Sequence, residues 1–428
     1  MERCFRAALT RVAAGPAVER VLRASGTEWT LDGRPVSGRV FALAAGKAAL
    51  PMAAAVEEWA GERLAAGLCV TKEGHGGSLG RFRVRETAHP VPDERSAAAG
   101  REALELAARV GEEDTLVVLL SGGASSLWSA PLPGLTLDDV RIVTGSLMSA
   151  GADIEALNTV RKHLTAVSGG RLARATGAGR VEVLALSDVP GDDPAVLASG
   201  PCSGDSSRFG DALAVLEERD LLAAAPPAVR AHLEAGRAGR IEESVAPGDP
   251  CLSRVRFTSL GNNEDACAAA CAEAERAGCV VRRYEPGLHG EAREAGRNLV
   301  RAARRLGAER ELVLVAGGET TVTVTGDGKG GRNQELALSA ALELAGETGA
   351  TLLAAGTDGT DGPTDMAGAF ADGETVARAE AAGVSAADAL AANDSYRFFA
   401  AEGGHLHTGP TGTNVMDLVL VHVPAARR

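Results

Sequence analysis

Residues Asp114–Ser126, DTLVVLLSGGASS, pass from an unbroken apolar run into a loop of serine, glycine and alanine. Such a run, bounded by glycines, is typical of a strand buried on both faces, as in a parallel sheet flanked by helices. The stretch 39–60, RVFALAAGKAALPMAAAVEEWA, repeats the arrangement and continues into a helix. Strand and helix patterns alternate along the chain, so we predict an α/β fold.

The length of the chain indicates more than one domain. A chain of 428 residues exceeds the size at which one hydrophobic core stays efficient, so we expect about two domains. The segment 226–250, PPAVRAHLEAGRAGRIEESVAPGDP, is rich in proline, glycine and charge and lacks a strong apolar run. We place the boundary there, which gives domains 1–240 and 241–428.

Composition excludes several classes of protein. A net charge of -13 opposes binding to nucleic acids or anionic membranes. We find no apolar run of membrane-spanning length, and the N-terminal 22 residues predict an amphipathic helix rather than an export signal. Seven cysteines, an odd number, indicate reduced thiols and a cytoplasmic location. Cys267 and Cys271 lack further ligands at metal spacing, so we expect them to pack in a helix.

Two loops follow predicted strands where open α/β sheets bind ligands, beyond the carboxyl ends of the strands. Lys47 can reach a phosphate or carboxylate there, or point to solvent from the first helical turn. Small residues in the second loop let backbone N–H groups approach an anion, although a plain turn is an equal alternative. This loop comprises Ser121, Gly122, Gly123 and Ser125, and it matches neither a Walker P-loop nor a Gly-x-Ser-x-Gly elbow.

The segment 151–173, GADIEALNTVRKHLTAVSGGRLA, carries polar residues at helical spacing. Glu155, Asn158, Arg161 and Lys162 lie three or four positions apart and share a helix face. That face would line a cleft with donors or form a solvated surface. His163 fits a packing role as well as that of a base.

Aspartates follow two further predicted strands. Carboxylates at strand ends suit Mg²⁺ or accept a hydroxyl proton, although aspartate is also common in turns. Because each cluster directly follows a buried strand, we expect at least one to be functional. The clusters are Asp188, Asp192 and Asp193, and Asp358, Asp361 and Asp365.

The segment 311–338, ELVLVAGGETTVTVTGDGKGGRNQELAL, predicts a strand, a glycine-rich turn and a helix that begins at Arg332 and Asn333. Bare N–H groups at a helix N-terminus suit an anion, which favours phosphate chemistry. Residues 326–331 also spell G-x-G-x-x-G. The preceding TTVTVT alternates polar residues instead of forming a buried strand, so this is weak evidence for a dinucleotide.

Five motifs occur in order along the chain: LLSGGASSLWSAPLPGLTLDDV, GADIEALNTVRKHLTAVSGGRLA, LSDVPGDDPAVLASGP, GGETTVTVTGDGKGGRNQELAL and AAGTDGTDGPTDMAGA. Together they resemble the glycerate 2-kinases, the type II glycerate kinases whose C-terminal part is called the MOFRL domain. The resemblance spans nearly the whole chain. The family's usual SGGGSAL is SGGASSL here and its usual EAGHP is ETAHP, and neither change removes a polar group that the mechanism needs.

This resemblance implies ATP- and Mg²⁺-dependent phosphorylation of D-glycerate at its 2-hydroxyl, giving 2-phosphoglycerate and ADP. It also implies a Rossmann-like, three-layer N-terminal domain with a parallel sheet and a smaller α/β C-terminal domain. The MOFRL region would cover about 310–420, with the active site in the cleft between the domains. Some members of the family have been called hydroxypyruvate reductases, so NAD(P)H-dependent reduction is one alternative. A non-catalytic nucleotide- or sugar-acid-binding regulator is another.

The resemblance and the residue types together indicate roles for individual residues. The family's motif lysine and arginine are Lys47 and Arg332, and we add Asp188 as a third catalytic group. We expect Asn158 and Arg161 to bind the substrate, because a guanidinium matches a carboxylate bidentately. Mg²⁺ is assigned to Asp193 and Asp358, and phosphate or nucleotide binding to Ser121, Gly122, Gly123, Ser125, Glu319, Gly330, Gly331 and Asn333. Which aspartate binds Mg²⁺ and which acts as base stays open, as does the oligomeric state, for which a homodimer is one option.

Overall fold

The chain forms two compact units. A computed structural model describes residues 1–25, 28–307 and 310–425. The N-terminal unit is Ala14–Leu260, and the C-terminal unit combines Met1–Ala13 with Gly261–Arg428. The division lies beyond the predicted boundary at 240/241, because strand β9 (Val255–Gly261) is the edge strand of the N-terminal sheet. The N-terminal helix α1 (Glu2–Arg11) packs on α11 (Asn263–Arg276), so it belongs to the C-terminal unit and not to the domain that was expected to begin at residue 1.

A six-stranded sheet organises the N-terminal unit. Its order is β6 (Phe82–Thr87), β5 (Leu64–Lys72), β4 (Val40–Ala45), β7 (Thr115–Leu120), β8 (Arg180–Leu186) and β9. The pairs β4–β5, β4–β7, β5–β6 and β7–β8 are parallel. Counted from β4, this is the strand order of a doubly wound Rossmann sheet, with its switch point between β4 and β7. The predicted Rossmann-like parallel sheet is confirmed.

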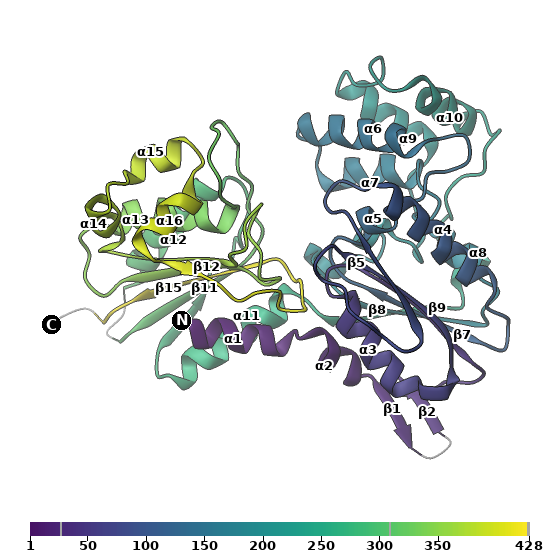
Figure 1. Ribbon diagram of the computed structural model, residues 1–428, viewed down its shortest axis with the longest axis horizontal. Coiled ribbons are helices and arrows are strands. Elements are labelled where there is room, and N and C mark those ends of the chain that lie inside the picture. Colours follow the sequence, from purple (N-terminus) through teal and green to yellow (C-terminus); the bar gives the residue numbers. More distant parts are fainter. Residues whose placement is uncertain (26–27, 308–309, 426–428) are drawn as a thin grey trace. The chain divides into compact units, whose positions relative to one another are not determined.

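Helices cover both faces of this sheet, which explains why its central strands are continuously apolar. Phe41, Leu43 and Ala45, at alternate positions of β4, join one core with helices α4 (Glu94–Ala108), α5 (Ala124–Leu127) and α8 (Arg171–Ala175). Helix α3 (Ala49–Ala60) packs on β4 and β5 from the other face (Figure 1). The three-layer prediction is therefore confirmed.

A second core lies among four helices of the N-terminal unit. Val143, Leu157, Phe209 and Leu233 pack together there. They come from α6 (Leu137–Ser149), α7 (Ile154–Lys162), α9 (Phe209–Glu218) and α10 (Pro227–Arg237), which Figure 1 shows gathered on one side of the sheet. The unit begins with α2 (Ala14–Glu19) and a small antiparallel sheet of β1 (Leu22–Ser25), β2 (Glu28–Leu31) and β3 (Arg34–Pro35).

The C-terminal unit is also α/β, but its sheet is mixed. The order is β10 (Val280–Arg283), β11 (Leu312–Gly318), β15 (Asp417–Val423), β12 (Thr351–Gly356), β13 (Gly368–Asp372) and β14 (His405–Leu406). Strands β10 and β11 run parallel and the other pairings are antiparallel. Helices α1 and α11 lie on one face (Figure 1). The other face packs against α12 (Ala292–Leu306), α13 (Arg332–Leu344), α14 (Thr375–Ala381), α15 (Ala386–Ala391) and α16 (Ser395–Glu402).

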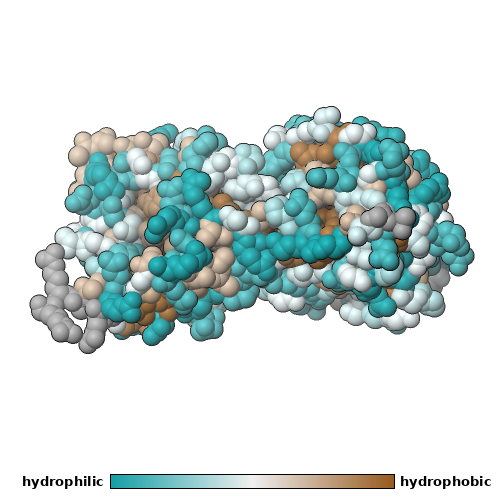
Figure 2. All heavy atoms as spheres, turned by 90° about the horizontal axis from the view of Figure 1, so that it is seen from below, coloured by the Kyte–Doolittle hydropathy of each residue, from teal (hydrophilic) through white to brown (hydrophobic). Residues whose placement is uncertain are grey.

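The surface seen in Figure 2 is mainly hydrophilic, and hydrophobic residues appear on it as small separate patches. None of the helices in the described ranges has the length and apolar content needed to span a bilayer. All seven cysteines are free thiols. Cys267 is buried in α11, and burial raises its pKa to about 12, which fits the expected packing role.

Candidate active site

The loops after β4 and β7 meet at the switch point of the N-terminal sheet. The Lys47 N–H donates to the carbonyl oxygen of Gly122 over 3.0 Å, and the Ala48 N–H donates to Ser121 Oγ over 3.1 Å. The Ser121 N–H donates back to the Ala45 carbonyl oxygen over 3.0 Å. Ligands of doubly wound sheets bind beyond this point, so two of the sequence motifs are joined where a ligand is expected.

Gly123 is the residue that allows two side chains to approach this loop. Its φ is +88°, a conformation that favours glycine. A Cβ atom added to it would lie 2.8 Å from His89 Nε2 and 3.7 Å from Lys47 Cγ. His89 therefore contacts the same loop as Lys47. Sequence reasoning missed it, and the available signal was its position two residues after β6, a strand that was not predicted.

Arg161 lies in a polar pocket of the N-terminal unit. Its guanidinium has no carboxylate partner among the residues that the structure describes. Burial lowers the pKa of Arg161 to about 10, so the side chain stays charged at neutral pH. A largely buried cation without a counter-ion is costly unless an anion occupies the site. The polar residues of the pocket besides Arg161 are Ser125, Ser126, Ser129, Thr144, Thr165, Ser168 and Ser199.

Asn158 fixes one wall of this pocket through a chain of hydroxyl groups. Ser199 Oγ donates to Asn158 Oδ1 over 2.8 Å and lies 2.9 Å from Ser125 Oγ. Because the Ser199 proton is used by Asn158, Ser125 is the donor in the second bond. Ser199 and its neighbour Ala198 have φ values of +59° and +52°, so the loop after β8 is strained where it meets the pocket. Ser199 was not predicted.

The polar face predicted on residues 155–162 divides in the structure. Arg161 lines the pocket and Asn158 contacts its lining residue Ser199, whereas Lys162 Nζ lies 3.3 Å from Asp205 Oδ1 in a buried ion pair. Glu155 is exposed. His163 is buried, with Nδ1 2.7 Å from the Thr159 carbonyl oxygen, so the packing alternative is the one that its contacts support.

The aspartates after β8 lie in a tight turn. Asp188 is two residues beyond the end of β8, and Asp193 Oδ1 accepts the N–H of Ala195 over 2.8 Å. Asp192 has a φ of +54° and accepts a hydrogen bond from Ser259 Oγ over 3.0 Å. No group of three or more His, Cys, Asp or Glu side chains that could hold a metal occurs in residues 1–25, 28–307 and 310–425.

Arg332, in the C-terminal unit, is held by two carboxylates. Its Nε and Nη2 donate to Asp417 Oδ2 and Oδ1 over 2.5 and 2.9 Å, and Nη1 pairs with Glu319. Burial opposes the charged form, but Asp417 and then Glu319 outweigh it and raise the pKa of Arg332. Asp417 was not predicted, although an aspartate at the start of the apolar segment DLVLVHV was a signal.

The first turn of α13 is capped by Asp361. Asp361 Oδ1 accepts the Asn333 N–H over 3.0 Å, and Oδ2 accepts the Gln334 N–H over 2.8 Å. The expectation that free N–H groups at Asn333 bind an anion is therefore wrong for this arrangement, because a carboxylate of the chain already accepts them. Burial raises the pKa of Asp361 to about 6. Asp358 closes its own turn, accepting the Thr360 N–H over 2.9 Å.

The glycines of residues 326–331 have a packing explanation. A Cβ at Gly330 would lie 2.1 Å from Ser395 Oγ, and one at Gly331 would lie 2.3 Å from the Asp361 carboxyl carbon. Gly328 is similarly close to the backbone of Ala392. Strand β11 ends at Gly318, so no strand leads directly into the G-x-G-x-x-G segment. A Rossmann dinucleotide turn needs that strand, which removes the dinucleotide interpretation of this motif.

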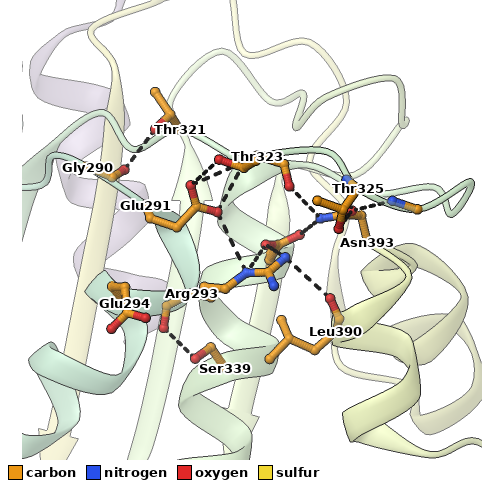
Figure 3. Close-up of polar contacts among 12 residues, drawn as sticks. Gly290, Glu291, Arg293, Glu294, Thr321, Thr323, Thr325, Ser339, Leu390 and Asn393 are labelled. Carbon is orange, nitrogen blue, oxygen red and sulfur yellow. Dashed lines mark hydrogen bonds and ion pairs between the residues drawn. The ribbon is translucent and has the colours of Figure 1, made fainter.

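Residues 319–331 connect β11 to α13. Side chains from outside this segment anchor its first half (Figure 3). Asn393 Oδ1 accepts the Thr325 N–H over 2.8 Å, and the Glu291 carboxylate accepts the Thr323 N–H over 3.1 Å. Asn393 Nδ2 donates in turn to Glu335 Oε2 on α13 over 2.9 Å, and Arg293 Nη2 lies 2.7 Å from Glu335 Oε1. The loop that leads to Arg332 is thus tied to the helix that follows it.

Comparison with known proteins gives matches over most of the chain. The model of a domain of unknown function, DUF4147, matches residues 1–234, and that of the MOFRL family matches residues 312–417. A glycerate 2-kinase of Pyrococcus horikoshii is 40% identical over 92% of this chain and 89% of its own length. A D-glycerate 2-kinase of Thermotoga maritima is 42% identical over 89% of this chain and 90% of its own length. A relative from Agrobacterium vitis is 39% identical over 89% of this chain and 86% of its own length. Its name, hydroxypyruvate reductase, is only provisional.

A solved structure is similar throughout. The crystal structure of glycerate kinase from Thermotoga maritima aligns with a TM-score of 0.82 at 39% identity, covering 98% of each chain.

Proposed function

Because this chain belongs to the MOFRL-family glycerate 2-kinases, we propose that it transfers the terminal phosphoryl group of ATP to the 2-hydroxyl of D-glycerate, giving 2-phosphoglycerate and ADP. The observation that carries the proposal is the junction of the Lys47 and Ser121 loops at the sheet's switch point. Phosphoryl transfer asks a protein for positioning and charge neutralisation more than for covalent chemistry. A lysine beside a loop of small residues supplies both.

Lys47 binds the phosphates of ATP in this proposal. Its ammonium group neutralises charge that develops on the transferred phosphoryl group, and main-chain N–H groups from Gly122 to Ser125 add donors. Arg332, in the C-terminal unit, stays a proposed phosphate-binding cation. We keep the assignment of Glu319, Gly330 and Gly331 to phosphate or nucleotide binding. The two glycines allow the loop to pack closely against Ser395 and Asp361.

The Arg161 pocket binds the carboxylate of glycerate. A guanidinium recognises a carboxylate through two parallel hydrogen bonds, and the surrounding hydroxyls satisfy its other polar atoms. Asn158 takes part by holding Ser199 and Ser125 in place. Asp188 is then the group that accepts the proton of the 2-hydroxyl.

Mg²⁺ is a further part of the proposal. The ion neutralises phosphate charge when bound, and proteins usually hold it by one or two carboxylates plus phosphate oxygens and water. A cluster of three protein ligands is therefore not required. Asp193 and Asp358 stay the proposed ligands, and their oxygen atoms suit this hard cation. A cytoplasmic location and a homodimer also stay predictions.

One experiment separates this proposal from its rivals. The protein is incubated with ATP, MgCl₂ and D-glycerate, and ADP is quantified. A parallel sample with hydroxypyruvate and NADH or NADPH is followed by absorbance. Glycerate-dependent ADP formation supports the kinase. Oxidation of the nicotinamide cofactor without ADP formation would establish a reductase, and the absence of both reactions with ATP binding retained would establish a regulator.

A further inference from the structure

We propose that Asp417 is the positioning residue for Arg332: it fixes the plane and direction of the guanidinium, so that the Nη1 edge is presented to the phosphate. The proposed kinase function supplies only the identity of that ligand. The positioning itself follows from contacts within the C-terminal unit.

The contact between the two side chains is bidentate. Nε and Nη2 of Arg332 donate in parallel to the two oxygens of Asp417, over 2.5 and 2.9 Å. Two such bonds fix both the position and the plane of a guanidinium, which a single ion pair cannot do. The Asp417 side chain is 1% exposed and that of Arg332 is 34% exposed, so the fixed edge is the buried one.

Asp417 itself has little freedom to move. It is the first residue of β15, the strand between β11 and β12, and its register partners on those strands are Gly318 and Gly356. Glycine on both sides leaves room for the carboxylate beside the strand ends. Asn263 Nδ2 also donates to the Asp417 carbonyl oxygen over 2.9 Å, which holds the backbone from the opposite face.

Glu319 is the contrasting partner of the same guanidinium. It pairs with Nη1 from the residue after β11, and its side chain is 48% exposed. Solvent, and therefore a phosphate, reaches Arg332 from the Glu319 side. The arginine thus has a buried permanent partner and an exposed one.

The N-terminal unit provides a matched control. Asp114, the residue before β7, has a side chain that is 7% exposed and accepts two hydrogen bonds from Arg39, over 3.2 and 2.8 Å. It is a buried carboxylate in a bidentate arginine pair, and it lies at the opposite end of β7 from Ser121. Loss of its charge should lower stability in the same way, without turning the guanidinium of Arg332.

The test is a double-mutant cycle on glycerate-dependent ADP formation, with kcat and KM for ATP measured for Asp417→Asn, Arg332→Lys and the double variant. We expect each single variant to lose at least tenfold in kcat, and the double variant to be within about twofold of the worse single one. Asp114→Asn should keep kcat within about threefold of wild type while its Tm falls like that of Asp417→Asn. Multiplicative losses in the double variant, or an Asp417→Asn kcat near wild type, would overturn the proposal.

A second measurement does not depend on turnover or on a folded Asp417 variant. The Arg332 Nε–H resonance, assigned by its loss in Arg332→Lys, should exchange slowly with D₂O in wild type and in Glu319→Gln. Rapid exchange in wild type, or in Glu319→Gln alone, would show that Asp417 does not hold the guanidinium. A wild type that makes no ADP with glycerate would overturn the proposed function, and the exchange experiment would still decide the positioning role.

Discussion

The main-chain N–H of Lys47 donates to the carbonyl oxygen of Gly122 over 3.0 Å, joining the loop after β4 to the loop after β7. This bond spans the switch point of the sheet, where the backbone direction of each loop is set by its own buried strand. The main chain of Lys47 is therefore positioned by the sheet.

Lys47→Ala should reduce kcat by about 100-fold or more, because removal of one preorganised donor to a developing charge costs on the order of 10² to 10³ in rate. The main-chain bond to Gly122 survives the substitution, so the Tm should stay within a few degrees of wild type. Arg141→Ala, at an exposed ion pair on α6 of the same unit, is the control and should keep full activity. Near-normal turnover by Lys47→Ala would remove the lysine from the mechanism.

Gly123→Ala should lose turnover, because its Cβ would be placed 2.8 Å from His89 Nε2 and in contact with Lys47. Gly134→Ala is the matched control: its φ is +87°, against +88° at Gly123, but nothing lies within 4 Å of its Cβ. Both variants should lose roughly 1 kcal/mol in urea unfolding from the strained backbone. Equal activity of the two would show that the crowding at Gly123 is harmless.

Arg161→Ala should raise the KM for D-glycerate by about 10- to 100-fold, the range expected for lost hydrogen bonds to a charged group. Arg161→Lys keeps the charge but loses the planar fork, so it should recover only part of this loss. The KM for ATP serves as the internal control and should change little. An unchanged KM for glycerate would place its carboxylate elsewhere.

Asp361 gives a pH prediction with a defined sign. Burial raises the pKa of this carboxyl from 3.8 to about 6 in the folded protein. At a pH below both pKa values, the Asp361 carboxyl is protonated in the folded and in the unfolded state alike. Between pH 4 and 6 only the unfolded state releases the proton, so the free energy of unfolding falls as the pH rises through this window. The total loss should not exceed about 3 kcal/mol.

The measurement compares wild type with Asp361→Asn in chemical unfolding at several pH values. The difference in unfolding free energy, wild type minus variant, should decrease between pH 4 and 6 and then level off. A difference that increases over that window would show that the hydrogen bonds from Asn333 and Gln334 outweigh burial and lower this pKa.

The local sequence pattern was sufficient to predict the elements that carry Ser121 and Arg332. The apolar run before Ser121 predicts a strand buried on both faces, and β7 is such a strand. Arg332 was expected at the start of a helix, and α13 begins there. These features depend on neighbours in sequence, which is why they could be predicted.

Features that depend on distant residues could not be predicted in this way. Asp417 is 85 residues from Arg332, and Ser199 is 41 residues from Asn158. Asp361, expected as a metal or base candidate with its neighbours, instead caps a helix that begins 29 residues earlier. The membership of α1 in the C-terminal unit could not be predicted for the same reason, because it depends on packing against the distant helix α11.

The position of the new phosphate ester on glycerate decides whether the protein is a glycerate 2-kinase. The protein is incubated with ATP, MgCl₂ and D-glycerate, and a two-dimensional ¹H–³¹P spectrum locates the new phosphate ester. We predict correlation of the phosphorus with the proton on C2, which identifies 2-phosphoglycerate, in amounts equal to ADP and absent with Lys47→Ala. A phosphate correlated with the C3 protons, or no phosphate ester of glycerate, would show that the protein is not a glycerate 2-kinase.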